Sequence, residues 1–170
     1  VVITILITNL MVTEIYVKGR FDLGVGKCAV VITEDVLPPN EKKVLHKVAW
    51  KVPETWDYKG NTIEADQFNC EILAVCYGLQ WCKANNKEVV NIYANTSTCE
   101  KWYHRGEIPE TRMMKKAYID AVQDFNDYFD TNNCTVSIDR IYAEYIPKNT
   151  DNPKFAEYNL LVNDMAVNLR

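Results

Sequence analysis

No apolar run in the 170-residue sequence approaches the roughly 20 residues that a membrane-spanning helix needs. The apolar first residues, "VVITILITNL", lack a basic flank and a small-residue cleavage site, so we interpret them as a buried strand and not as a signal peptide. The chain also has no internal repeat and no low-complexity segment. We therefore expect no membrane partner and a single domain that spans residues 1–170.

The sequence has no CxxC pair, and no secretory segment precedes its cysteines. In a chain of this length, isolated cysteines are more often buried thiols than disulfides. We therefore expect a reducing intracellular compartment, the cytoplasm. The cysteines to which this applies are Cys28, Cys70, Cys76, Cys82, Cys99 and Cys134.

An excess of positive charge is also missing, since the formal net charge is -4 at pH 7. This charge gives no general attraction to nucleic acid, so a nucleic-acid partner would need a local basic patch. Lys115 and Lys116 are one example of such a patch.

Three strands are predicted in the first third of the chain. Residues 1–10 are apolar on both faces, as in a central strand covered by helices, whereas residues 43–52 alternate between an apolar and a more polar set. Residues 24–33 form another strand, and "EDVLPPNEK" turns the chain between the last two. Three consecutive strands predict an antiparallel meander.

The hydrophobic period changes after this meander. From Ile63 to about Asn85, apolar residues recur at spacings of three and four, which predicts a helix capped by Asp66 or Thr62. The next predicted elements are a strand, a short helix that begins near Ser97, a longer helix, a strand and a final helix. The two strands are predicted at 88–95 and 134–146, the longer helix at 112–129 and the final helix at 155–169.

This order of elements predicts an α/β fold. Right-handed crossovers would place the later strands parallel to the first, in a mixed sheet with helices on both faces. Ligands of such sheets bind where parallel strands end, here near Asn9 and Asn95. In many α/β nucleases an aspartate at such a strand end holds a metal ion, so the two asparagines raise the question of a site that has lost its charge.

Four stretches occur in the order of known motifs, namely "NCEILAVCYGLQW", "IYANTSTCEKWYHRG", "IPKNTDN" and "YNLLVNDMA". With them the chain resembles the ribonuclease H family, and within it the caulimovirus-viroplasmin-associated type. The resemblance covers nearly the whole chain. It implies a ribonuclease H-like fold, with a five-stranded mixed sheet built from an antiparallel meander and parallel βα units and flanked by helices.

The resemblance also implies a chemistry: cleavage of the RNA strand of an RNA/DNA hybrid by two divalent ions, Mg²⁺ or Mn²⁺, held by clustered carboxylates. Carried over by position, the catalytic and metal-binding residues fall at Asn9, Glu71, Asn95 and Asn163. Only Glu71 keeps a carboxylate. Because an amide does not offset a cation's charge, we expect metal to bind weakly, if it binds.

Two further positions follow from the resemblance as substrate-binding candidates. The histidine of the family's mobile loop falls at Asn149, and Trp102 lies in the "EKW" motif, where its ring could stack on a base. Each candidate also has a structural interpretation: asparagine is a common turn residue, Glu71 could be a solvated helix residue, and Trp102 could pack in the core. Asp164, next to Asn163, would be the retained acid if the alignment shifted by one residue.

Two functions remain open at this point. In the first, the chain is a ribonuclease H whose catalysis is impaired or abolished and which still binds an RNA/DNA hybrid or another nucleic acid. In the second, it is a non-catalytic ribonuclease H-like scaffold or interaction module of a larger polypeptide, which the acidic balance and the missing initial Met would allow. Whether it is an enzyme is therefore undecided by the sequence.

Overall fold

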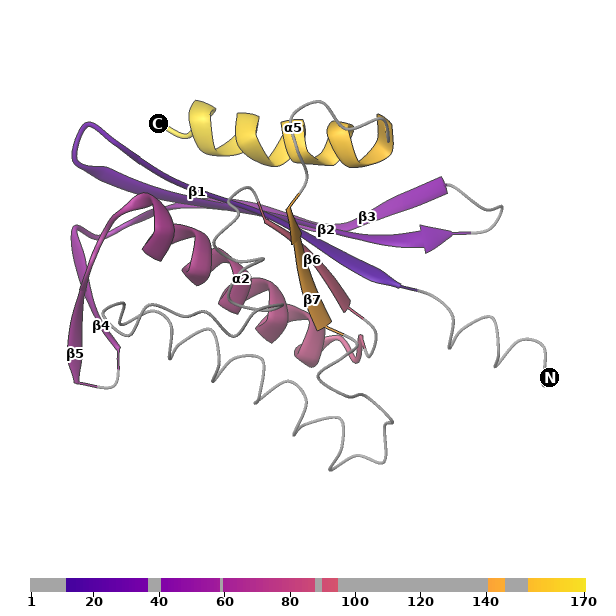
Figure 1. Cartoon of the computed structure of the whole chain (residues 1–170), viewed down its shortest axis with the longest axis horizontal. Coiled ribbons are helices and arrows are strands. Elements are labelled where there is room, and N and C mark those ends of the chain that lie inside the picture. Colours follow the sequence, from indigo (N-terminus) through magenta and orange to yellow (C-terminus); the bar gives the residue numbers. More distant parts are fainter. Residues whose placement is uncertain (1–11, 37–40, 59, 88–89, 95–140, 146–152) are drawn as a thin grey trace.

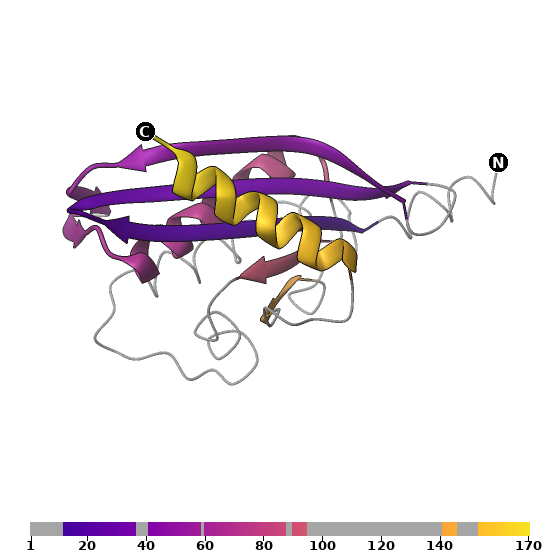
Figure 2. The same ribbon diagram turned by 90° about the horizontal axis from the view of Figure 1, so that it is seen from above.

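The computed structural model describes residues 12–36, 41–58, 60–87, 90–94, 141–145 and 153–170. These residues form a five-stranded sheet with one helix on each face, α2 (Gln67–Ala84) on one side and α5 (Pro153–Asn168) on the other (Figure 1). Seen from above, α5 runs diagonally across the sheet (Figure 2). No helix in these ranges is long and apolar enough to cross a membrane.

The five strands lie in the order β3-β2-β1-β6-β7. The antiparallel meander consists of β1 (Thr13–Asp22), β2 (Val25–Val36) and β3 (Glu41–Val52). On the other side of β1, β6 (Val90–Ala94) pairs parallel with β1, and β7 (Ile141–Tyr145) pairs parallel with β6. The predicted fold class, a mixed sheet that joins a meander to parallel βα units, is confirmed.

The first strand of the meander was predicted at residues 1–10, and this prediction was wrong: the central strand is Thr13–Asp22, and residues 1–10 lie outside the described part. A two-residue turn connects β1 directly to β2, with Asp22 paired to Val25. Leu23 and Gly24 have positive φ angles of 52 and 77 degrees, as a tight hairpin turn requires at both central positions.

The helix predicted from Ile63 begins instead at Gln67. Residues before it form a short hairpin that the sequence pattern did not predict, with β4 (Thr55–Tyr58) antiparallel to β5 (Asn61–Glu64). Of the two predicted caps, Asp66 is confirmed, because its side chain accepts a hydrogen bond of 2.7 Å from the backbone N–H of Asn69. The helix therefore starts where its first exposed N–H groups find an acceptor.

Each face of the sheet has its own hydrophobic core. Against α2, Ile15 and Val17 of β1 pack with the helix residues Ile72, Val75 and Leu79, all at most 1% exposed. Against α5, the core is rich in tyrosine. There the Tyr16 ring lies 5.0 Å from Tyr93 and 5.4 Å from Tyr158, measured between ring centroids, and the helix also buries Val162 and Ala166.

The cysteines of the described part are free thiols, as predicted for a chain without disulfides. Cys28 on β2 and Cys70 on α2 are both buried, and the Cys28 thiol donates to the carbonyl oxygen of Cys70 at 3.0 Å. Cys82 is also buried, and burial raises the pKa of its thiol. These thiols therefore belong to the core.

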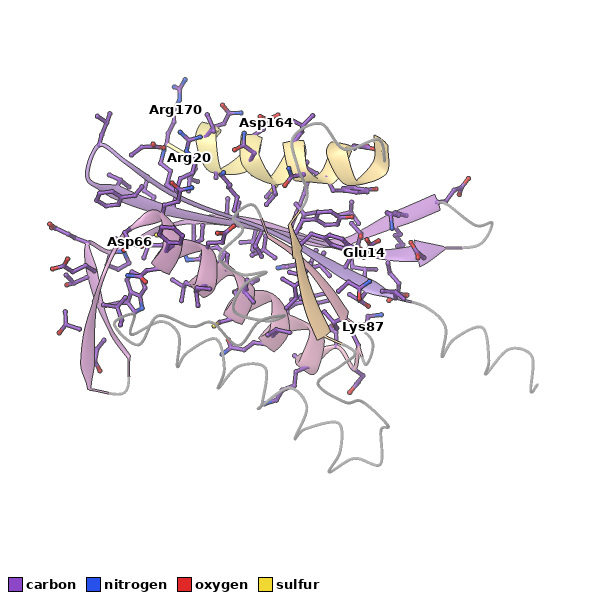
Figure 3. All side chains as sticks on the ribbon, in the orientation of Figure 1. Glu14, Arg20, Asp66, Lys87, Asp164 and Arg170 are labelled. Carbon is purple, nitrogen blue, oxygen red and sulfur yellow. The ribbon has the colours of Figure 1, made fainter. Side chains whose placement is uncertain are left out.

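A buried ion pair connects β1 to the edge strand β3 on the α5 side. Glu14, labelled in Figure 3, is 2% exposed and accepts from the Lys42 ammonium, which also donates to Asp35 at 2.9 Å. The Tyr16 hydroxyl donates to the same Glu14 carboxylate at 3.1 Å. Burial alone would lower the pKa of Lys42, but hydrogen bonds to Asp35 and Glu14 outweigh it and raise that pKa.

Replacing Lys42 by Met should lower the free energy of unfolding by about 3 kcal/mol, because the buried Glu14 carboxylate loses its counter-ion. The matched control is Lys43→Met, one residue away on an exposed position, which should change stability by less than about 0.5 kcal/mol. Urea unfolding of the two variants measures the difference. Equal stabilities would show that the ion pair contributes little.

Candidate functional site

The candidate site lies where β6 ends beside the central strand. The last registered pair between β1 and β6 joins Tyr16 to Tyr93, and β6 stops one residue later at Ala94. Counting two residues on from that pair leads to Lys18 in β1 and to position 95, which is outside the described residues. The β1 position two residues beyond the last registered pair is therefore a lysine.

The side chain of Lys18 lies on the α5 side of the sheet. Lys18 is paired directly with Ala29 of β2, which packs in the core under α5, and it is two residues from Tyr16 in the same core. It is half-buried, between the fully buried Val17 and Gly19. A cation thus stands in the middle of the central strand, at a position not singled out by the sequence patterns.

Glu71 of α2 approaches the same part of β1 through Gly19. A Cβ atom at Gly19 would lie only 2.2 Å from the backbone nitrogen of Glu71 and 2.6 Å from the carbonyl oxygen of Gln67. The absence of a side chain therefore lets the first turn of α2 rest on the strand. Glu71 is 1% exposed, so the solvated-helix interpretation was wrong.

Helix α5 brings Asn163 to the level of Lys18. The helix runs in the same direction as β1 (Figures 1 and 2), and its Tyr158 contacts Tyr16. Two residues along a strand, from Tyr16 to Lys18, cover about 6.6 Å, which is the rise of four to five helical residues. That rise leads from Tyr158 to residues 162 and 163.

Asn163, and not its neighbour Asp164, is the residue on the sheet side of α5. Asn163 is half-buried beside the fully buried Val162, whereas Asp164 is exposed. The alternative in which Asp164 is the retained acid is therefore unfavourable, because the Asp164 side chain faces solvent.

The other predicted site residues lie outside the described part of the chain. This applies to Asn9, Asn95, Asn149 and Trp102. Their roles stay predictions. For Asn9 the fold adds a difficulty, because the strand that it was expected to end is not the central strand of the sheet.

Comparison with solved structures identifies the architecture. The chain is similar to ribonuclease H1 from Halobacterium salinarum (TM-score 0.57, 11% identity, covering 92% of this chain and 95% of that one). It is similar to LC11-RNase H1 in complex with an RNA/DNA hybrid (TM-score 0.58, 12% identity, 91% and 94% covered). The chain has a ribonuclease H-like fold. A third similar structure is an N-terminal ribonuclease H domain from Mycobacterium tuberculosis (TM-score 0.57, 12% identity, 92% and 96% covered).

The sequence comparisons give no further identification. No protein-family model matches this chain, and no curated protein matches it. At 11% to 12% identity, the likeness to the solved structures establishes the ribonuclease H-like fold and leaves the chemistry to the residues of this chain.

The described side chains at this site do not fit a divalent metal. Lys18 carries three N–H donors and no acceptor, so it cannot ligate a cation, and its charge repels one. Of Lys18, Glu71 and Asn163, only Glu71 has a carboxylate, and Asn163 offers only a neutral amide oxygen. Within the described ranges, no three His, Cys, Asp or Glu side chains are placed to hold a metal ion.

A signal for Lys18 was present in the sequence. In "TEIYVKGRFDLGVGK", side chains alternate up to Gly19, and "LG" stands between two runs of strand-forming residues. Such a pattern predicts a tight hairpin at "LG" whose first strand contains "KG". The strand was instead predicted at residues 1–10, because these residues are more apolar.

The contact at Gly19 can be tested by adding one methyl group. Gly19→Ala should lower the free energy of unfolding by about 3 kcal/mol, because the new Cβ would overlap backbone atoms of α2 that cannot move away easily. The control Gly24→Ala meets no atom within 4 Å and should lose only about 1 kcal/mol through its positive φ. Equal losses measured by urea unfolding would contradict the close approach of α2.

Proposed function

We propose that this chain is a ribonuclease H-like module that binds an RNA/DNA hybrid and does not cleave it by two-metal hydrolysis. The observation that carries the proposal is Lys18, a cation on the central strand beside the end of β6. Ribonuclease H catalysis requires carboxylates that hold divalent ions at this edge of the sheet. A lysine there places a positive charge where that catalysis requires negative ones.

The role of Lys18 in this proposal is to balance the charge of Glu71. A carboxylate that is 1% exposed is stable only when a positive charge or hydrogen-bond donors compensate its lost hydration. Gly19, the residue after Lys18, lies against the backbone of Glu71. Lys18 itself faces the α5 side of the sheet, so in this proposal its long side chain brings the ammonium past the strand to compensate that carboxylate. In this arrangement one fixed ammonium takes over the electrostatic role of a divalent ion and leaves no vacancy for one.

Asparagine at positions 95 and 163 agrees with this proposal. An amide keeps the shape of the carboxylate that the resemblance implies there and removes its charge. Four carboxylates at close range would repel one another strongly. One Lys–Glu pair with two amides is instead neutral as a set. We propose that Mg²⁺ or Mn²⁺ binds this chain weakly at most.

Support for hybrid binding comes from the fold and from the sequence motifs. LC11-RNase H1, which shares the fold, was solved in complex with an RNA/DNA hybrid. The sequence motifs add the resemblance to the caulimovirus-viroplasmin-associated type.

Free thiols in the core support a reducing compartment, and we propose the cytoplasm.

The net charge of -4 favours a second candidate, a ribonuclease H-like scaffold or interaction module within a larger polypeptide. An acidic chain has no general attraction for phosphates, so nucleic-acid binding depends entirely on where its cations lie. The two candidates differ in one measurable property, which is affinity for a duplex at low salt.

Fluorescence anisotropy and gel electrophoresis on one labelled RNA/DNA hybrid test the proposal. We expect salt-sensitive binding at low ionic strength and no cleavage in Mg²⁺ or in Mn²⁺, because Lys18 excludes the ions. Cleavage by this chain that disappears with EDTA would overturn the non-catalytic part. Absence of binding at low salt would overturn hybrid recognition and favour the scaffold.

A further inference from the structure

A row of three cations crosses the meander on its α5 side. Arg20 of β1 is paired directly with Lys27 of β2, and Lys27 is paired directly with Lys51 of β3. Paired residues of neighbouring strands point to the same face, and Lys27 is two residues from Ala29, which packs under α5. Figure 3 shows Arg20 on this side of the sheet. We call Arg20, Lys27 and Lys51 the basic row.

The basic row is unfavourable for the fold by itself. Like charges directly opposite one another on neighbouring strands destabilise a sheet, and strands lie only about 4.8 Å apart. Within the described part of the chain, Asp22 is the carboxylate that pairs with the row: Arg20 donates to it at 2.7 Å and 3.2 Å. That hydrogen bond from Arg20 lowers the pKa of Asp22. One carboxylate therefore faces three cations.

Neighbouring positions on the same face extend the positive charge. Lys47 of β3 is paired with Val31, another residue of the core under α5, and Lys47 and Lys51 are both exposed. Lys18 precedes Arg20 by two residues on the same face. The row therefore lies about 6.6 Å along the strand from the candidate site.

We propose that the basic row is the surface on which this chain holds the phosphate backbone of a nucleic acid. This inference rests on the proposed function and names the surface that performs it. Three cations on adjacent strands span about 10 Å, which corresponds to about three nucleotide steps of one nucleic-acid strand at 3.4 Å of helix axis per nucleotide. In a chain with net charge -4, such a local concentration of cations supplies the attraction that the composition as a whole lacks.

Charge reversals on opposite faces of one strand test this inference. Lys51→Glu changes the basic row, whereas Lys43→Glu makes the same change of charge on the same strand but on the α2 side, where Lys43 is paired with Glu34. Both lysines are exposed. The two variants therefore share net charge and strand and differ in the face that they alter.

The measurement is the Kd of a labelled RNA/DNA hybrid as a function of KCl concentration, by fluorescence anisotropy. We expect Lys27→Glu/Lys51→Glu to weaken binding about tenfold and to reduce the salt slope by about two, and Lys43→Glu to stay within about twofold of the unchanged chain. If the half-buried Lys27 does not tolerate the change, Lys51→Glu alone should weaken binding about threefold and reduce the slope by about one.

The outcomes separate this inference from the function on which it rests. If the unchanged chain binds the hybrid and the Lys51 variants bind equally well, the basic row is not the binding surface and the proposed function stands. If Lys43→Glu weakens binding as much as Lys51→Glu, the effect comes from net charge and the row is again overturned. If the unchanged chain binds no hybrid at low salt, the proposed function fails, and this inference with it.

Discussion

The close contact between β1 and α2 at Gly19 is the constraint on which the rest of the site depends. Because Gly19 has no side chain, the first turn of α2 rests on the strand and its Glu71 becomes buried. A buried carboxylate then needs a compensating charge or hydrogen-bond donors near this contact. In a metal-dependent nuclease that charge comes from divalent ions held by several acids. In this chain Lys18, the residue before Gly19, stands at that place.

The same strand connects the site to the surface beside it. From Tyr16 in the tyrosine-rich core, every second residue of β1 lies under or beside α5, namely Lys18 at the site and Arg20 in the basic row. Alternation along this strand therefore places an aromatic core residue, the cation of the candidate site and a cation of the basic row on one face of the sheet. The tight turn at Leu23 and Gly24 ends this strand and returns the chain through Lys27.

Much of the fold could be predicted because its patterns are local. The period of α2, its Asp66 cap and the order of strands and helices follow from spacing and capping chemistry, and they led to the correct fold class. The first strand was misplaced because residues 1–10 are uniformly apolar, whereas Thr13–Asp22 mixes buried charge with apolar residues. Glu14 looks like a surface residue in the sequence, and only its partner Lys42, from a distant strand, explains why it is buried.

The candidate site could be predicted only in part for the same reason. Glu71 and Asn163 were assigned correctly to the helices that cover the two faces, since helix positions follow from periodicity. Lys18 was missed because its importance depends on the register between β1 and β6, which no local pattern contains. The change from an acid to a cation also hides such a residue from any search for carboxylates.

The most direct test of this account compares two triple variants by calorimetric titration with Mn²⁺. Both carry Asn95→Asp and Asn163→Asp; one adds Lys18→Asp and the other adds Asn9→Asp. If Lys18 occupies the metal position, only the variant with Lys18→Asp should bind Mn²⁺ with measurable heat, because it alone removes the ammonium and completes four carboxylates with Glu71. Equally tight binding by the Asn9→Asp variant would contradict the account and return the first-strand position to Asn9.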